Sequence, residues 1–149
     1  MPSQKITPFL WFNNNQALEA ATFYTSLFDD ARILATTPVV VKFSLAGQEF
    51  CALNGGPQYK FTPAISLLIS CEDQAEVDRF WDGLLSDGGR PQPCGWLVDK
   101  FGVSWQVVPK VLPELLNHED PARAQRTQEA MMQMQKLDIA ALQKANAGN

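Results

Sequence analysis

The chain has 149 residues, of which 46% are hydrophobic and 19% charged, and its formal net charge is −4. This length and balance are typical of a globular chain with a full core, and we expect residues 1–149 to form a single domain. The absence of a basic cluster argues against nucleic acid or anionic membranes as partners, and no apolar run approaches the roughly 20 residues of a membrane span.

The first third of the chain predicts a strand, a helix and three more strands. An apolar strand is expected over residues 6–12, with Pro8 restricting it to a sheet edge or a bulge. Apolar residues at helical spacing predict a helix over 16–28, which one of the asparagines at 13–15 can cap. Short strands are expected over 32–36, 39–46 and 49–54.

The same order of elements recurs from residue 64. A strand is expected over 64–70, and Asp73 can cap a helix that runs to about residue 86. A weak strand over 90–93 and two further strands over 96–98 and 103–109 follow. We therefore predict two modules, over 5–57 and 62–110, followed by a helical tail over 111–149.

The tail is expected to hold a short helix over 114–117, a helix from the Asp120 cap to about residue 135, and a helix over 139–145 after Asp138. It can pack on its own sheet or on a second subunit, and both alternatives stay open.

Residues 94–109 predict a hairpin around a turn over 99–102. Alternation along the second strand places Val103, Trp105 and Val107 on one face and Ser104 and Gln106 on the other. Because a buried, unpaired glutamine costs about 1–3 kcal/mol, Gln106 is expected either to bond a neighbouring strand or to line a wet cavity.

The three cysteines, Cys51, Cys71 and Cys94, include no CxxC pair. Since the polar N-terminus shows no export signal, we expect reduced thiols and a cytoplasmic location. Buried, unreactive thiols are the expectation, and Cys94 is the one whose reactivity stays open.

Several strings together resemble one known family: Leu53-Asn54-Gly55-Gly56-Pro57, Cys94-Gly95-Trp96-Leu97, Asp99-Lys100-Phe101-Gly102, Ser104-Trp105-Gln106, Trp11-Phe12 and Asp138-Ile139-Ala140. The chain resembles the PhnB-like family, whose members often carry the label 3-demethylubiquinone-9 3-methyltransferase. That family belongs to the vicinal-oxygen-chelate superfamily, with glyoxalase I, bleomycin-resistance and extradiol-dioxygenase proteins. The resemblance implies an α+β fold of paired βαβββ modules, with mixed curled sheets that each enclose half of a cavity, usually in a homodimer.

The resemblance also implies where a metal would bind, since superfamily enzymes hold a divalent ion through His and Glu side chains facing the cavity. Pro8, Ile65 or Ser66, and Gln106 stand nearest those positions here. One neutral amide cannot replace anionic or imidazole ligands, so no metal site is expected. The single histidine, His118, lies in the tail and is expected at the surface.

The methyltransferase label implies an adenosylmethionine site, which typically needs a Gly-rich turn leading from a strand into a helix. Gly55-Gly56 follows a strand but leads to Pro57. No motif pairs a nucleophile with a base, so catalytic residues are unassigned and no cofactor is expected.

A cavity remains as the expected functional feature. Assuming inward parity on each strand, its lining is expected to be Leu10, Phe12, Asn54, Cys94, Trp96, Ser104 and Gln106. We therefore predict a cytoplasmic protein that binds a small organic molecule of planar or aromatic kind without metal, as the homodimer that the resemblance implies. The alternatives are a metal-dependent lyase, isomerase or dioxygenase of the superfamily, the methyltransferase of the label, and a purely structural or interaction role.

Overall fold

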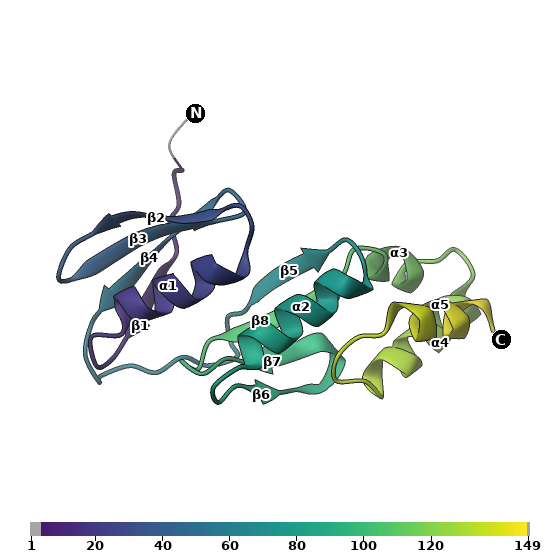
Figure 1. The fold of residues 1–149 in the computed structure, drawn as a ribbon. Helices are drawn as coiled ribbons and strands as arrows, with labels where there is room; N and C mark the ends of the chain where they lie inside the picture. Colours follow the sequence, from purple (N-terminus) through teal and green to yellow (C-terminus); the bar gives the residue numbers. More distant parts are fainter. Residues whose placement is uncertain (1–3, 149) are drawn as a thin grey trace. The chain divides into compact units, whose positions relative to one another are not determined.

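A computed structural model describes residues 4–148 and divides them into two compact units, the first ending at Phe61 and the second beginning at Thr62 (Figure 1). Each unit combines one mixed four-stranded sheet with helices, so the α+β class is confirmed. Strand, helix and three strands recur in the same order in both, which confirms the doubled βαβββ pattern. No helix within residues 4–148 is long and apolar enough to cross a membrane.

The first unit consists of β1 (Phe9–Phe12), α1 (Ala17–Leu27), β2 (Ala31–Thr36), β3 (Val40–Leu45) and β4 (Gln48–Asn54). Its sheet has the order β1-β4-β3-β2, with β1 parallel to β4 and the other pairs antiparallel. The helix α1 covers one face, where Tyr24 stacks on Phe43 and Phe43 on Phe50. Alternate residues of β3 and β4 thus point toward the helix and build the core.

The first turn of α1 is capped from the sheet. The backbone N–H of Ala17 donates to Oδ1 of Asn54, at the end of β4, over 2.9 Å. Asn14 and Asn15 instead adopt φ of 55° and 54° in the turn before the helix. The structure therefore differs from the cap expected at residues 13–15, because Asn54 supplies the acceptor that the helix end needs.

The second unit begins with β5 (Leu67–Cys71), α2 (Gln74–Leu85), β6 (Arg90–Pro91), the 3-10 turn η1 (Pro93–Gly95), β7 (Trp96–Val98) and β8 (Ser104–Pro109). The sheet order is β5-β8-β7-β6, and Asp73 caps α2 as predicted. The weak strand expected over 90–93 is only two residues long, because the chain turns into η1 at Pro93.

Both sheets are open, with edge strands β1 and β2 in the first unit and β5 and β6 in the second (Figure 1). Curling a sheet around a hollow requires strands that tilt and stagger across many pairs. Neither four-stranded sheet does this by itself, so the curl that the resemblance implies is not seen within either unit.

The turn between β7 and β8 is held by the buried carboxylate of Asp99. Its Oδ1 accepts hydrogen bonds from the backbone N–H groups of Phe101 (2.8 Å) and Val103 (3.1 Å). Its Oδ2 accepts one from Nε1 of Trp105 over 2.9 Å. Trp105 is the largest fully buried side chain of the described residues. One carboxylate therefore fixes the predicted turn, the start of β8 and the centre of the core under α2.

Within the chain, the tail packs on the second unit, as in the first of the two alternatives. Its helices α3 (Leu112–Leu116), α4 (Pro121–Met132) and α5 (Ile139–Ala147) surround an apolar cluster built on Leu112, Leu137 and Leu142. Gln74, in the first turn of α2, donates to the carbonyl of Leu137 (3.0 Å) and accepts from the N–H of Ile139 (2.8 Å).

A segment between α4 and α5 ties the tail to η1. The N–H of Cys94 donates to the carbonyl of Met134 and that of Gly95 to the carbonyl of Gln135, both over 2.8 Å. A Cβ at Gly95 would lie 2.9 Å from Cδ1 of Leu137, and its φ is +86°, so only glycine suits this position. Because residues 134–135 bond η1 in this way, α4 ends at Met132 rather than near residue 135.

We expect Asp99→Asn to lower the free energy of unfolding by about 2–3 kcal/mol. The amide oxygen can replace only one of the two carboxylate oxygens, so at least one of the three buried N–H groups then faces an NH2 group and loses its acceptor. Urea denaturation measures the loss. The matched control is Asp87→Asn, which alters an exposed carboxylate 3.7 Å from Nζ of Lys100 and should cost less than about 0.5 kcal/mol. Equal losses in the two variants would contradict the role of Asp99.

We expect Leu137→Ala to cost about 2–5 kcal/mol, because Leu137 is fully buried and the truncation leaves a cavity. Amide hydrogen exchange at Cys94 and Gly95 should also accelerate, since their acceptors lie in the adjoining segment. Met132→Ala, at an exposed position on α4, is the control. Unchanged exchange at both amides would show that the tail does not hold η1.

Candidate functional site

The sheet of the second unit has one face under α2 and one face turned away from it. The helix packs on the face that carries Leu97, Trp105 and Val107, which are almost completely buried. Residues paired across the strands share a face, and faces alternate along each strand. The side turned away from α2, here called the open face, therefore carries Arg90, Trp96, Val98, Ser104 and Gln106. This arrangement confirms the alternation predicted for 103–107.

A hollow of about 340 Å³ lies over the open face. The residues that line it are Pro63, Arg90, Gln92, Pro93, Trp96, Leu97, Val98 and Ser104. They supply an indole ring, a guanidinium, an amide and a hydroxyl beside apolar groups, while the side chain of Leu97 lies on the other face of the sheet, under α2. The volume of the hollow is within the range of small-molecule sites. Of the residues expected to line a cavity, this hollow brings together Trp96 and Ser104.

Gln106 lies beside the hollow, opposite Trp96 in the register of β7 and β8. Its Nε2 donates to Oγ of Ser66 over 2.9 Å. Ser66 immediately precedes β5, the neighbouring strand, so Gln106 is paired with a neighbour, which is the first of the two alternatives.

Ser66 and Gln106 are also the second-module positions that the resemblance associates with metal ligands. Their donors are a hydroxyl and an amide whose nitrogen faces that hydroxyl, so the pair offers a divalent cation neither negative charge nor imidazole. Within residues 4–148, no group of three or more His, Cys, Asp or Glu side chains could hold an ion. The residues present do not fit the metal of the superfamily.

The three first-module residues expected at the cavity lie on the helix-covered face of their sheet. Leu10 and Phe12 are buried, and Asn54 bonds the N-terminus of α1. The parity assumed for the first strand is therefore opposite to the observed one, and Phe9 and Trp11 take the face turned away from α1. Because 9–12 is apolar on both faces, its sequence contains no alternation from which the parity could be read.

Gly55 and Gly56 form a turn that closes on Trp11. The indole Nε1 donates to the carbonyl of Gly56 over 2.9 Å, and the ring lies where a Cβ of Gly55 would be. Tyr59 packs edge-on against the same indole. Gly55 is thus explained by a close approach of backbone and ring, and no helix follows the turn to bind an adenosylmethionine.

Two of the cysteines, Cys51 and Cys71, provide no activated nucleophile. Burial raises the pKa of Cys71 to about 12, and burial also raises that of Cys51 although Lys42 opposes the shift. Both thiols therefore stay protonated near neutral pH. Cys94 lies in η1, is half-buried and has a φ of 65°. Pro93 and Trp96, on either side of it in the sequence, line the hollow, but Cys94 does not.

His118 lies in the loop between α3 and α4, away from the open face. It is partly exposed, and its Nδ1 accepts from the N–H of Asp120 over 3.0 Å. It therefore serves the turn before α4 and contributes nothing to the hollow.

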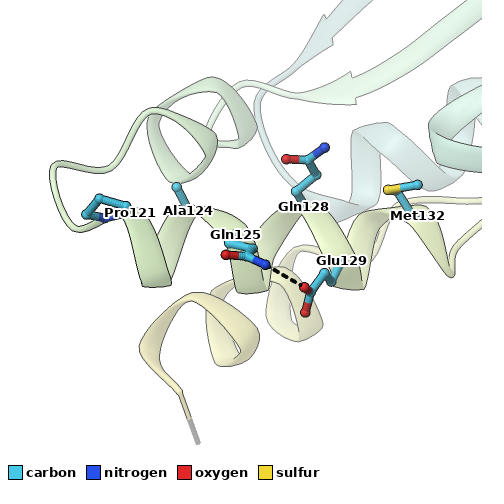
Figure 2. A pocket seen from close by; sticks show the side chains of 6 residues that line it. All are labelled: Pro121, Ala124, Gln125, Gln128, Glu129 and Met132. Carbon is cyan, nitrogen blue, oxygen red and sulfur yellow. Dashed lines mark hydrogen bonds between the residues drawn. The ribbon is translucent and has the colours of Figure 1, made fainter.

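A second hollow, of about 470 Å³, runs along the outer side of α4 (Figure 2). All its lining residues come from that one helix: Pro121, Ala124, Gln125, Gln128, Glu129 and Met132. Gln125 donates to Glu129 within it, as Figure 2 shows. Because no second element faces these side chains, this hollow brings no groups together from different parts of the chain, unlike the one over the open face.

Sequence reasoning missed Arg90, Gln92 and Pro63. Arg90 pairs with Val98, so the weak strand over 90–93 contained a usable signal: its register against 96–98 decides which side chains join Trp96. Pro63 had no such signal, because it precedes β5 in an irregular segment.

Comparisons with known proteins agree with this fold. The family model for 3-demethylubiquinone-9 3-methyltransferase matches residues 4–108, which span both modules and end before α3. The string Asp138-Ile139-Ala140 therefore lies outside the matched region. No match was found among curated proteins.

Solved structures extend the comparison. A putative 3-demethylubiquinone-9 3-methyltransferase, PhnB protein, from Bacillus cereus is 37% identical, over 71% of this chain and 99% of that one, with a TM-score of 0.65. A glyoxalase/bleomycin resistance protein from Albidiferax ferrireducens (13% identity, 71% and 99% coverage, TM-score 0.54) shares the fold. So does a fosfomycin resistance protein from Listeria monocytogenes, solved with manganese(II) and sulfate (14% identity, 76% and 99% coverage, TM-score 0.54).

The family model covers well over half of the chain, and the Bacillus cereus protein matches almost throughout its own length. The chain therefore belongs to the 3-demethylubiquinone-9 3-methyltransferase family, on the fold of the glyoxalase and bleomycin-resistance superfamily.

Proposed function

We propose that this protein binds a small, planar organic molecule in the hollow over the open face of the second sheet, without a metal ion. One observation carries the proposal: about 340 Å³ of space is lined by Trp96 together with the polar groups of Arg90, Gln92 and Ser104. An apolar hollow with a few converging polar groups is the usual form of a small-molecule site.

The indole of Trp96 is the main contact surface for such a ligand. The indole is partly exposed. An aromatic ring of a ligand can stack on it even where that ligand makes few hydrogen bonds to the protein. Gln92 and Ser104 can then select among planar molecules through hydrogen bonds. Gln106, paired with Ser66, is a neutral group on the same face of the sheet as Trp96.

A metal-dependent lyase, isomerase or dioxygenase is the alternative within the superfamily. The neutral Ser66–Gln106 pair favours binding over such catalysis, because Lewis-acid chemistry needs ligands that hold the ion firmly. The methyltransferase of the family name is a further alternative, and the packing of Gly55 on Trp11 favours a structural role for that turn.

We further propose that the protein acts as a cytoplasmic homodimer. Leu68 in edge strand β5 and Ile65 just before it are exposed apolar side chains. One edge of β5 is unpaired. Exposed edges and apolar side chains of this kind are commonly covered by another chain. A second copy of the chain would bury these side chains. If no ligand binds, a purely structural role of such a dimer is the remaining alternative.

We expect Trp96→Ala to weaken binding of aromatic fragments found in a screen by at least about tenfold, because the stacking surface is lost. Isothermal titration or ligand-detected NMR measures the change. Tyr59→Ala, which removes an exposed aromatic ring from the first unit, is the control and should leave binding unchanged. Fragments that bind Trp96→Ala and the parent protein equally would contradict the proposed site.

We expect protein purified without chelator and dialysed against manganese(II) or zinc(II) to retain less than stoichiometric metal. The physical reason is the neutral donor set at Ser66 and Gln106. Elemental analysis gives the ratio, and Gln106→Ala separates specific from surface binding. A full equivalent of ion that disappears in Gln106→Ala would revive the metal-dependent alternative.

A further inference from the structure

We infer that the ligand of the hollow carries a negatively charged group, such as a carboxylate, that pairs with Arg90; this inference rests on the proposed function. The lining contains one formal charge, the guanidinium of Arg90, and no Asp or Glu. The net charge of the whole chain is −4, so this positive site contrasts with the molecule around it.

The other arginines with assigned contacts serve the fold. Arg123 and Arg126 donate to the carbonyls of Ala145 and Asn146 at the end of α5, where cations offset the helix dipole. Arg79 lies over the ring of Phe80. By contrast, Arg90 takes part in none of the ion pairs or side-chain hydrogen bonds found in residues 4–148.

Two acidic groups close to Arg90 in the sequence have other partners. Asp87 lies 3.7 Å from Lys100, and the carboxylate of buried Asp99 accepts three hydrogen bonds. The strand register places Arg90 beside Val98 on the same face as Trp96. A planar molecule that stacks on the indole can therefore direct an anionic substituent to the guanidinium.

The chemistry of the remaining lining agrees with an aromatic anion. A guanidinium binds a carboxylate through two parallel N–H groups, and a ring that stacks nearby excludes water from that pair. Gln92 and Ser104 add neutral hydrogen-bonding groups at the same hollow. A neutral aromatic molecule would use the ring and the amide but leave the guanidinium with solvent alone.

The test compares benzoate with benzamide, which have nearly the same shape but differ in charge. We expect benzoate to bind the full-length protein roughly five- to twentyfold more tightly in NMR titrations, with a preference that shrinks as salt is added. Arg90→Gln should abolish the preference, and Arg90→Lys should retain part of it. Arg32→Gln, which removes an exposed strand arginine from the first unit, should leave it intact.

The outcomes separate this inference from the proposed function. If both probes bind equally and Trp96→Ala weakens both, the hollow is a ligand site and the anionic preference is wrong. If the preference survives in Arg90→Gln, the charge lies elsewhere and the inference is overturned. If neither probe binds and a fragment screen finds no ligand that depends on Trp96, the proposed function fails and this inference fails with it.

Discussion

The three hydrogen bonds accepted by Asp99 determine which residues reach the candidate site. The same carboxylate accepts from the N–H of Val103 and from the indole of Trp105, and that indole is buried on the α2 side of the sheet. Ser104 then faces the opposite side, and the cross-strand register places Val98 on that side with it. A buried carboxylate that is fully hydrogen-bonded in this way is stable in the core, whereas a partly satisfied one would be costly. The open face is thus a consequence of how the core is built.

The rim of the hollow depends on a part of the chain outside the family match. Residues 4–108 match the family model, yet η1, which contributes Pro93 and leads into Trp96, is bonded to the carbonyls of Met134 and Gln135. Leu137 packs so closely on Gly95 that no side chain fits there. The tail therefore stabilises the backbone that leads into Trp96, which connects it to the candidate site as well as to the apolar cluster of α3–α5.

The Ser66–Gln106 pair shows how such a scaffold can exist without metal ligands. Polar side chains on a partly buried face must find partners, and a hydroxyl and an amide satisfy each other across adjacent strands at little cost. In the described residues, no buried side-chain nitrogen or oxygen lacks a partner. The positive charge of Arg90 is therefore the main electrostatic feature left for a ligand on this face.

The elements and their order were determined by local sequence. Helical spacing, caps such as Asp73, Asp120 and Asp138, and the turn at residues 99–102 act over a few residues, so they can be read without a structure. The alternation along β8 was available for the same reason, whereas the register that sets Trp96 opposite Gln106 was not predicted. Only tertiary structure decided the parity of β1, where Leu10 and Phe12 face α1, because an apolar strand without alternation fits either face. It also showed the contacts of the tail with α2, because these join segments far apart in the sequence. The weak strand over 90–93 hinted at Arg90, but only the observed register of that two-residue strand placed Arg90 at the hollow.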